Sequence, residues 1–447
     1  MPLYGETQIA TPNIDRLAAE GITFTNAVSS CPLCTPYRSM LLTGRHPQST
    51  GHVVNFVRTR HDEIGIGDAF SHAGYRTGWI GKWHLHTGSF PQIEGEDFVP
   101  RGRDRLGFEY WRAYNFHSEY FNGWVNTGDW GNECWQGYET EALTRYVFEF
   151  LEETADQPFC LFLSPHQPHY TYTEKFAPEK YYENIPEQLA LPGNVPDSWK
   201  AESLKVYKHY LAMVLALDAM VGQLIEYLDK TSKRENTLVV LTSDHGTQMG
   251  ANGIAPWAKK NPYMESLKVP FIMSLPGVLE GGCRRNPLIA PVDIFPTLCA
   301  LSGIPIPKTV EGYNLSEAVL GIPGAFEQDC VLTMNFSKGH DYLLDGQEWR
   351  GLINKKYIYN KWLDGKIELF DIEADPLLLH NEVNNPQLSD KKKSLEKQLE
   401  KFLVERGDAF QTGYSYRSWF DPQRRVCRNG FGFLGDPEKE PDWSLLA

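Results

Sequence analysis

The sequence predicts an α/β protein with a doubly wound, mostly parallel sheet flanked by helices and a smaller C-terminal α+β subdomain. The first observation is an alternation, in which apolar stretches that end in polar or glycine-rich turns are separated by segments with helical spacing. The second is length, because 447 residues exceed what one hydrophobic core usually holds. One large domain with a smaller appendage is therefore expected.

Short apolar runs are the candidate buried strands of this sheet. They lie at 76–81, 158–164, 238–243 and 269–275. In a doubly wound sheet, ligand-binding groups gather at the carboxyl ends of the strands. The residues that directly follow each run are therefore the first place to look for chemistry.

Helices are expected where capping signals and apolar spacing agree. Thr11 is a good N-cap and Pro12 suits the first helical position, while Gly21 follows the apolar pattern of this first helix. The longest helix is expected over 201–230, where apolar residues recur at helical spacing. That spacing predicts a structural role on the sheet.

The C-terminal part changes character after the proline- and glycine-rich segment 303–324. Short strand-like runs and one polar helix follow, at 330–334, 351–354, 356–359 and 389–406. We therefore predict a catalytic domain over 1–325 and an α+β subdomain over 326–447.

Composition limits the possible partners. The formal net charge is −14, from 43 basic and 57 acidic residues spread along the chain. This argues against binding to nucleic acid or to an anionic membrane surface. No apolar run approaches the roughly 18 residues of a membrane span and no signal peptide is recognised, so the cytoplasm is the default expectation. The eight cysteines form no dense disulfide pattern.

One segment carries the strongest chemical signal. The run C-T-P-Y-R at 34–38, followed by L-L-T-G-R at 41–45, resembles the C-x-P-x-R and L-T-G-R signature of formylglycine-dependent sulfatases in the alkaline phosphatase superfamily. The resemblance implies an alkaline-phosphatase-like fold and a sulfuric ester hydrolase. It also implies that a formylglycine-generating enzyme oxidises Cys34 to formylglycine (3-oxoalanine). The hydrated aldehyde would attack the ester, and the covalent sulfated intermediate would then be eliminated.

Local physics also places Cys34 in an anion site. Pro36 and the apolar pattern before Gly44 predict a helix that begins near residue 34, where free backbone N–H groups and the helix dipole favour an anion. A redox or zinc pair of Cys31 and Cys34 stays as an alternative. It is disfavoured because no second close pair of cysteines or histidines completes a tetrahedral site.

Further segments match the family in the same order along the chain. They are G-K-W-H at 81–84, P-H-Q-P-H at 165–169, T-S-D-H-G at 242–246 and K-K-N-P-Y-M-E-S at 259–266. By this resemblance, Lys82 and Lys259 would bind sulfate oxygens, with Arg38 as a third cation. His84 would take the proton that releases sulfate, and His169 would protonate the leaving alcohol.

Two residues beside these candidates receive a different interpretation. His166 is the second choice for the acid, because it lies closer to the end of the preceding strand and has less reach. Lys260 is expected to be an ordinary solvated charge.

The resemblance also implies a metal. Asp244 and His245, together with residue 34, would hold a divalent cation, Ca²⁺ or Mg²⁺, that polarises the sulfate. Family members normally add two carboxylates from an apolar strand ahead of the T-P-N helix, and that strand does not occur in this sequence. Without it, sheet edges and an apolar groove are expected, and calcium lacks its usual six to eight or so oxygens.

Two explanations of this difference stay open. Either the natural chain starts upstream, with a segment that could also carry an export signal, or the protein is a metal-poor member of the family. The leading functional expectation is hydrolysis of a sulfate ester, with a sulfated carbohydrate as the family-level substrate. The alternatives are a phosphonate monoester or phosphodiester hydrolase of the same superfamily, and a non-catalytic binding protein. Aromatic residues are dense over 108–124, as a sugar-stacking wall or as ordinary packing.

Overall fold

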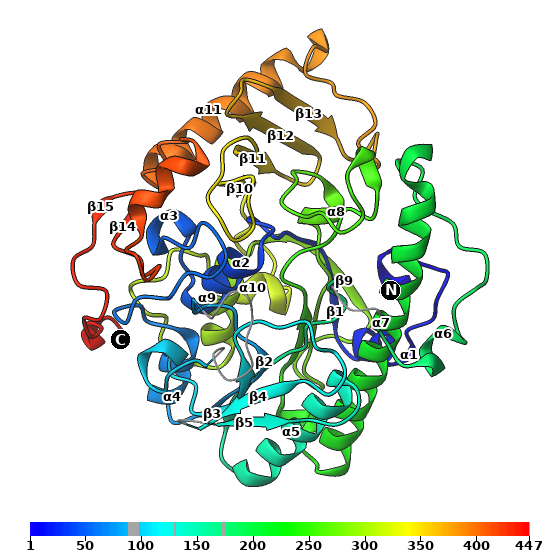
Figure 1. The fold of residues 1–447 in the computed structure, drawn as a ribbon, viewed down its shortest axis with the longest axis vertical. Helices are drawn as coiled ribbons and strands as arrows, with labels where there is room; N and C mark the ends of the chain where they lie inside the picture. The colour runs from blue at the N-terminus through cyan, green and yellow to red at the C-terminus, as the bar shows by residue number, and fades with distance from the viewer. Residues whose placement is uncertain (88–97, 129–130, 171–174, 447) are drawn as a thin grey trace.

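The N-terminal part of the molecule contains two sheets (Figure 1). The computed structural model describes residues 1–87, 98–128, 131–170 and 175–446. One sheet has the strand order β7 (Val239–Thr242), β8 (Phe271–Ser274), β1 (Ile22–Ala27) and β9 (Cys283–Ile289). The other has the order β5 (Asn132–Cys134), β4 (Trp124–Thr127), β3 (Tyr110–Tyr114), β2 (Arg76–Lys82) and β6 (Phe159–Ser164). The runs expected as strands correspond to β2, β6, β7 and β8.

Pairing within these sheets is mixed. β2 runs parallel to β3 and β6, and β1 runs parallel to β9. The consecutive strands β3, β4 and β5 pair antiparallel, as strands joined by short connections do. β8 is antiparallel to both β1 and β7. The sheets therefore contain more antiparallel pairing than the sequence suggested, while the α/β class is confirmed.

Helices cover both faces of the sheets. The strand β2 shows why, because its successive side chains point to opposite faces. Trp79 packs into one cluster with α4 and α9, whereas Ile80 packs into another with α5. One layer consists of α2 (Cys34–Thr43), α4 (Ile66–His72) and α9 (Pro291–Leu301), and the other of α1 (Pro12–Ala19), α5 (Glu139–Thr154) and α7 (Asp197–Lys230). The shorter helices are α3 (Pro47–Thr50), α6 (Glu179–Tyr182), α8 (Met264–Leu267) and α10 (Ser316–Leu320). The doubly wound arrangement is thus confirmed.

The long helix α7 corrects the expectation that no segment of the sequence is long and apolar enough to span a membrane. Among the described residues it is long and apolar enough, by length and composition, to cross a membrane, with a mean hydropathy of 1.6 in its most apolar window. Half of that window is buried inside the protein, and a buried core helix passes the same test. Part of the remaining apolar surface of α7 faces a cavity rather than packed neighbours.

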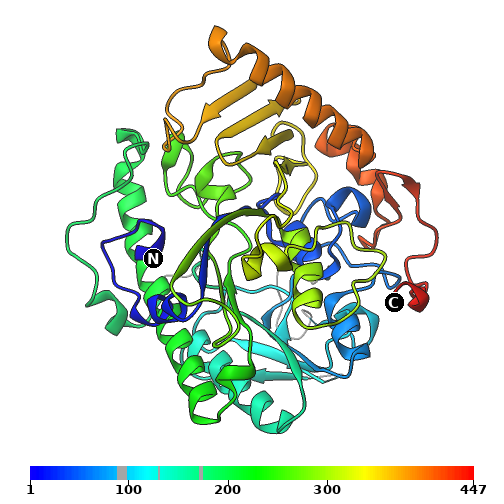
Figure 2. The ribbon, with the colours of Figure 1, turned by 180° about the vertical axis from the view of Figure 1, so that it is seen from behind.

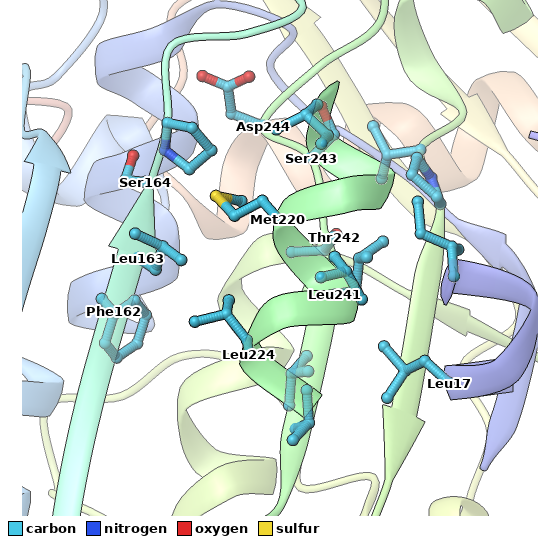
Figure 3. A pocket seen from close by; sticks show the side chains of 18 of the residues that line it. Leu17, Phe162, Leu163, Ser164, Met220, Leu224, Leu241, Thr242, Ser243 and Asp244 are labelled. Carbon is cyan, nitrogen blue, oxygen red and sulfur yellow. The ribbon is translucent and has the colours of Figure 1, made fainter. Parts of the chain in front are cut away.

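This cavity, the slot, lies between the facing edges of β6 and β7. Its volume is about 1810 Å³, and it is lined by side chains from both strands and from both helical layers. Figure 3 shows Leu163 of β6 and Leu241 of β7 on its two sides, with Met220 and Leu224 of α7 across it. In the described part of the chain, β6 pairs only with β2, and β7 pairs only with β8. The expected apolar groove between sheet edges is confirmed.

The C-terminal part contains an antiparallel sheet with α11 (Ser389–Glu405) beside it at the top of both ribbon views (Figures 1 and 2). Its strands follow in order as β10 (Val331–Asn335), β11 (Trp349–Ile353), β12 (Tyr357–Trp362) and β13 (Ile367–Asp371). A small hairpin follows, of β14 (Arg428–Asn429) and β15 (Gly432–Phe433). One hydrophobic cluster joins Trp349 of this part with Met40 of α2. The domain boundary at 325/326 stays a prediction.

Candidate active site

Cys34 is the first residue of α2 and has no exposed surface. The helix starts there because Leu33 is still extended, with φ −145° and ψ 141°, and it ends at Gly44 with φ 65° in the left-handed region. Asn55 Oδ1 accepts a hydrogen bond from Thr35 N at 3.1 Å, which holds the first turn. The Cys34 sulfur therefore lies at the positive end of a helix.

Three basic side chains meet at this sulfur. Lys82, the last residue of β2, places Nζ 3.5 Å from Cys34 Sγ, and Lys259 places Nζ 3.3 Å from it. His245 Nε2 lies at 3.4 Å. Burial raises the pKa of the Cys34 thiol, but the charges of Lys259, Lys82 and His245 outweigh burial and leave that pKa well below its usual value. The pocket is built to hold negative charge at residue 34.

Arg38 lies one helical turn after Cys34 and forms hydrogen bonds with three segments that surround the site. Its Nη1 donates to Lys82 O at 2.9 Å and to Ser164 Oγ at 2.8 Å. Its Nη2 donates to Asp244 Oδ2 at 3.3 Å. One guanidinium therefore contacts the carboxyl ends of β2 and β6 and the loop that follows β7.

The end of β2 approaches β6 very closely. Gly81 has φ 93°, and a Cβ added there would lie 2.3 Å from Ser164 O. Only glycine fits this position. The turn that follows carries His84, also with positive φ (59°), back beside the site.

His169 belongs to the cluster through Lys259. Lys259 Nζ lies 3.0 Å from His169 Nε2, and His169 Nδ1 lies 2.6 Å from Tyr170 O. The ring of His166 lies beside it, tilted by 30° with centroids 4.6 Å apart, but neither His166 ring nitrogen has a hydrogen-bond partner among the residues that the structure describes. This geometry favours His169 over His166 as the histidine that reaches the site.

His84 lies in the wall of the same pocket. It is fully buried, and its imidazole ring packs against the rings of Phe56 and Phe116. Burial lowers the pKa of His84 to about 3, although Cys34 is near enough to raise it in part. The lowered pKa leaves the imidazole neutral, and within the described part of the chain neither of its ring nitrogens has a hydrogen-bond partner.

The expected metal ligands also come together. One ligand atom from each of Cys34, Asp244 and His245 lies within 4.8 Å of the others. Burial raises the pKa of the Asp244 carboxyl, but His245, Arg38 and Lys82 outweigh this and lower the pKa to about 2. Asp244 is therefore ionised and can serve as an oxygen ligand.

Lys260 is not a solvated charge, so that expectation from the sequence is wrong. It is 3% exposed, and its Nζ donates to the carbonyls of Ser337, Lys338 and Gly339 at 3.0, 2.6 and 2.9 Å. Its backbone has a positive φ of 68°, and its side chain runs to these carbonyls whereas that of Lys259 runs to Cys34. One lysine enters the pocket and the next anchors the loop after β10.

Sequence reasoning missed two residues that shape the pocket. Ser164 ends β6 and holds Arg38, a role that its position at a strand end could have suggested. Asn55 accepts a hydrogen bond from Thr35 N through Oδ1, and its Nδ2 donates to Asp341 Oδ1 at 3.3 Å. No sequence motif marks Asn55, because its role depends on a loop folding back over α2.

The aromatic stretch at 108–124 forms ordinary packing in large part. Phe108, Trp111, Tyr114 and Tyr120 are at most 3% exposed. Trp111 and Phe108 both pack against Trp83, inside the core next to β2. A sugar-stacking wall made of these buried rings is therefore excluded.

Comparisons with known proteins agree with this geometry. The family model described as Sulfatase matches residues 1–304, and the model described as N-sulphoglucosamine sulphohydrolase, C-terminal, matches residues 255–405. An ulvan-active sulfatase of Formosa agariphila is 35% identical over 423 residues, covering 91% of this chain and 79% of that protein. An endo-4-O-sulfatase of Bacteroides thetaiotaomicron is 30% identical, covering 83% of this chain and 81% of that protein.

A solved structure extends the likeness to the fold. A Bacteroides fragilis protein described as a YidJ sulfatase superposes with a TM-score of 0.82 at 26% identity, covering 93% of this chain and 94% of that one. The family model alone spans more than half of the chain. The chain therefore belongs to the sulfatase family, with the alkaline-phosphatase-like fold, and is a sulfuric ester hydrolase.

Proposed function

We propose that the chain hydrolyses a sulfate ester of a sulfated carbohydrate, with formylglycine at position 34. The observation that carries this is the meeting of two lysine ammonium groups and a helix N-terminus at one buried atom, Cys34 Sγ. A sulfate monoester needs such a concentration of positive charge. The carbohydrate class rests on the relatives, one of them ulvan-active and another an endo-4-O-sulfatase.

The modification changes what residue 34 supplies. The Sγ position stands where an oxygen of the aldehyde hydrate would lie, and the hydrate would supply an oxygen nucleophile. Cys34 is 0% exposed, so a formylglycine-generating enzyme could reach it only before the chain folds. Oxidation during or soon after synthesis is therefore part of the proposal.

The fixed cations bind and orient the sulfate. Lys82 and Lys259 approach residue 34 from different segments, so each would contact a different sulfate oxygen. Arg38 is held by Ser164 and Asp244, which keeps its charge beside the group without freedom to move away. Groups held in place before the reaction stabilise the charge that builds on the oxygens at little reorganisation cost.

Two histidines would handle protons. His169 would donate a proton to the leaving alcohol oxygen, and because burial and Lys259 lower the pKa of its imidazole, that proton would be supplied by the Lys259 ammonium, whose Nζ lies 3.0 Å from His169 Nε2. His84 has a pKa lowered to about 3 by burial, so it is neutral at physiological pH and would accept the proton released at residue 34. The leaving group and the nucleophile thus have separate proton partners.

A divalent cation fits the described residues only in part. Asp244 offers carboxylate oxygen, His245 offers nitrogen, and residue 34 would offer oxygen once modified. Calcium takes about six to eight oxygen ligands, so this set does not complete its shell. Such a cation would polarise the sulfate, but none of the steps assigned above to the chain's own residues depends on it.

Co-expression with a formylglycine-generating enzyme tests the proposal. Mass spectrometry of the peptide that contains residue 34 should show conversion of the thiol to an aldehyde. The modified protein, supplied with Ca²⁺ or Mg²⁺, should then cleave an aryl sulfate and a sulfated oligosaccharide. Faster cleavage of an aryl phosphonate monoester than of either sulfate would favour the phosphonate hydrolase instead. Aldehyde formation without cleavage of any ester would reject the assigned mechanism.

A further inference from the structure

We propose that Asp341, in the loop after β10, is a specificity-determining residue that accepts a hydrogen bond from a free hydroxyl group of the substrate, next to the sulfate. A substrate that carries a second negative group at that position would be repelled. This assignment rests on the proposed function, because a hydroxyl group beside the sulfate is a property of carbohydrate esters.

One side chain joins Asp341 to the start of α2. Asn55 Oδ1 accepts a hydrogen bond from Thr35 N at 3.1 Å, and Asn55 Nδ2 donates to Asp341 Oδ1 at 3.3 Å. A single amide group therefore separates the Asp341 carboxylate from the first turn of the helix. Burial raises the pKa of the Asp341 carboxyl, and Lys259 and Cys34 are near enough for their charges to shift it in opposite directions. Because Asp341 is only half-buried, it lies at the rim of the anion pocket.

The loop that carries Asp341 is held by two segments that form the pocket. Lys260 Nζ donates to the three carbonyls of residues 337–339, at 3.0, 2.6 and 2.9 Å. Asn55 N donates to His340 O at 3.0 Å. Asp341 follows these anchored residues directly, so its main chain is fixed relative to the site.

The same loop is also closed on itself. Ser337 Oγ accepts hydrogen bonds from Gly339 N at 3.1 Å and from Leu344 N at 2.8 Å. A Cβ added at Gly339 would lie 2.0 Å from Tyr342 O, so only glycine fits there. A loop held in this way places Asp341 before the substrate binds, and little freedom is lost when a hydrogen bond forms.

The charge of Asp341 opposes the binding of sulfate alone. Like charges repel, and Asp341 has no ion-pair partner among the residues that the structure describes. Arg424, a nearby cation, donates instead to the Asn55 carbonyl at 2.8 Å. In the same part of the chain, Asn55 is the side chain that donates to the Asp341 carboxylate, which leaves its second oxygen available. A substrate hydroxyl group would supply a donor there, and the hydrogen bond to a charged acceptor would offset the repulsion.

Asp341→Asn tests this role because it keeps the shape of the side chain and removes the charge. With formylglycine at position 34, kcat/KM for 4-nitrophenyl sulfate, which has no hydroxyl group, should rise about three- to tenfold. For a sulfated disaccharide that the native protein cleaves and that has a free hydroxyl group beside the sulfate, kcat/KM should fall by about tenfold or more. A general loss of structure would not move the two substrates in opposite directions.

Asp345→Asn is the matched control. Asp345 belongs to the same loop, but its carboxylate accepts from Tyr414 N at 2.7 Å rather than from Asn55. Its exposed charge should change kcat/KM for either substrate by less than about twofold. The native protein should cleave a disaccharide with a second sulfate in place of the hydroxyl group at least about tenfold more slowly, and Asp341→Asn should narrow this difference.

Calorimetric binding of inorganic sulfate to the unmodified chain needs no turnover. Asp341→Asn should bind sulfate about three- to tenfold more tightly than the native protein. Native protein that binds sulfate but cleaves no sulfate ester would overturn the proposed function, and this inference with it. Unchanged sulfate affinity in Asp341→Asn, or cleavage of both esters with changes of the same sign, would overturn the role of Asp341 alone.

Discussion

The carboxyl ends of β6 and β7 are tied together, whereas the same two strands face each other over an open slot along their length. At the ends, Arg38 contacts Ser164 and Asp244. Along the strands there is no shared ladder, and the lining is apolar. The difference teaches that this active site is assembled by α2 and the loops after the strands.

The largest expected effect concerns the nucleophile, residue 34, near the carboxyl ends of β6 and β7. Cys34→Ala removes the only side chain in this proposal that can become the attacking group, so aryl sulfate hydrolysis should fall by on the order of 10⁴-fold or more. Cys31→Ala is the matched control, because Cys31 is a buried thiol whose pKa is raised to about 12 by burial. Initial rates of both proteins decide the question. Equal losses in the two variants would contradict the assignment of residue 34.

Arg38→Met, compared with Arg38→Lys, should distinguish two roles of Arg38: its charge beside the sulfate and its contact between β6 and the loop after β7. It removes a cation from the sulfate and breaks the contact between β6 and the β7 loop, so kcat/KM should fall by roughly 10²–10³-fold. Hydrogen exchange at Ser164 should also become faster. Arg38→Lys keeps the charge but cannot reach all three acceptors, so it should recover part of kcat/KM and little of the protection. Full recovery of protection by lysine would show that the guanidinium does not bridge the strands.

Lys260→Met tests the anchor beside the site. It leaves three carbonyls without their donor, so the free energy of unfolding should fall by ~2–4 kcal/mol. Burial lowers the pKa of Lys260 from 10.5 to about 7. Between these values the unfolded chain holds a proton that the folded chain lacks, so the stability from this group rises with pH.

The gap in unfolding free energy between the native protein and Lys260→Met should therefore widen from pH 7 to pH 9, as measured by urea unfolding. Lys393→Met, at an exposed lysine of α11, should show no such trend. A gap that narrows with pH would mean that the carbonyls hold the protonated amine more strongly than burial opposes it.

The smallest effect probes the open length of the strands. Ile272 of β8 is 0% exposed, whereas Leu241 of β7 lines the slot and is half-buried. Ile272→Ala should cost ~3–4 kcal/mol, but Leu241→Ala only about 1–2 kcal/mol, because its side chain has fewer packed neighbours. Urea unfolding measures both. Equal costs in the two variants would contradict the difference in packing between these side chains.

The parts of the structure that the sequence predicts well are those with local signals. The helix at residue 34 follows from Pro36 and Gly44, and α1 follows from Thr11 and Pro12. The candidate residues meet because they follow strands whose carboxyl ends share one edge. Their catalytic roles stay predictions.

Other parts depend on contacts between distant segments and have no local signal. Asn55 matters because a loop returns over α2, and Lys260 is buried because the loop after β10 presents carbonyls to it. The strand β13 is short and was not recognised, since its apolar run is too brief to distinguish from a loop. The antiparallel direction of β8 also follows from chain path rather than from composition.

The neighbouring lysines have a mechanical consequence. Lys259 contacts the sulfur of Cys34. The next residue, Lys260, donates hydrogen bonds to three carbonyls of the loop after β10. A tilt of the C-terminal sheet would pull on Lys260 and shift the ammonium of Lys259 through a single peptide unit. A contact made on the C-terminal sheet would thus change the affinity of the pocket for an anion.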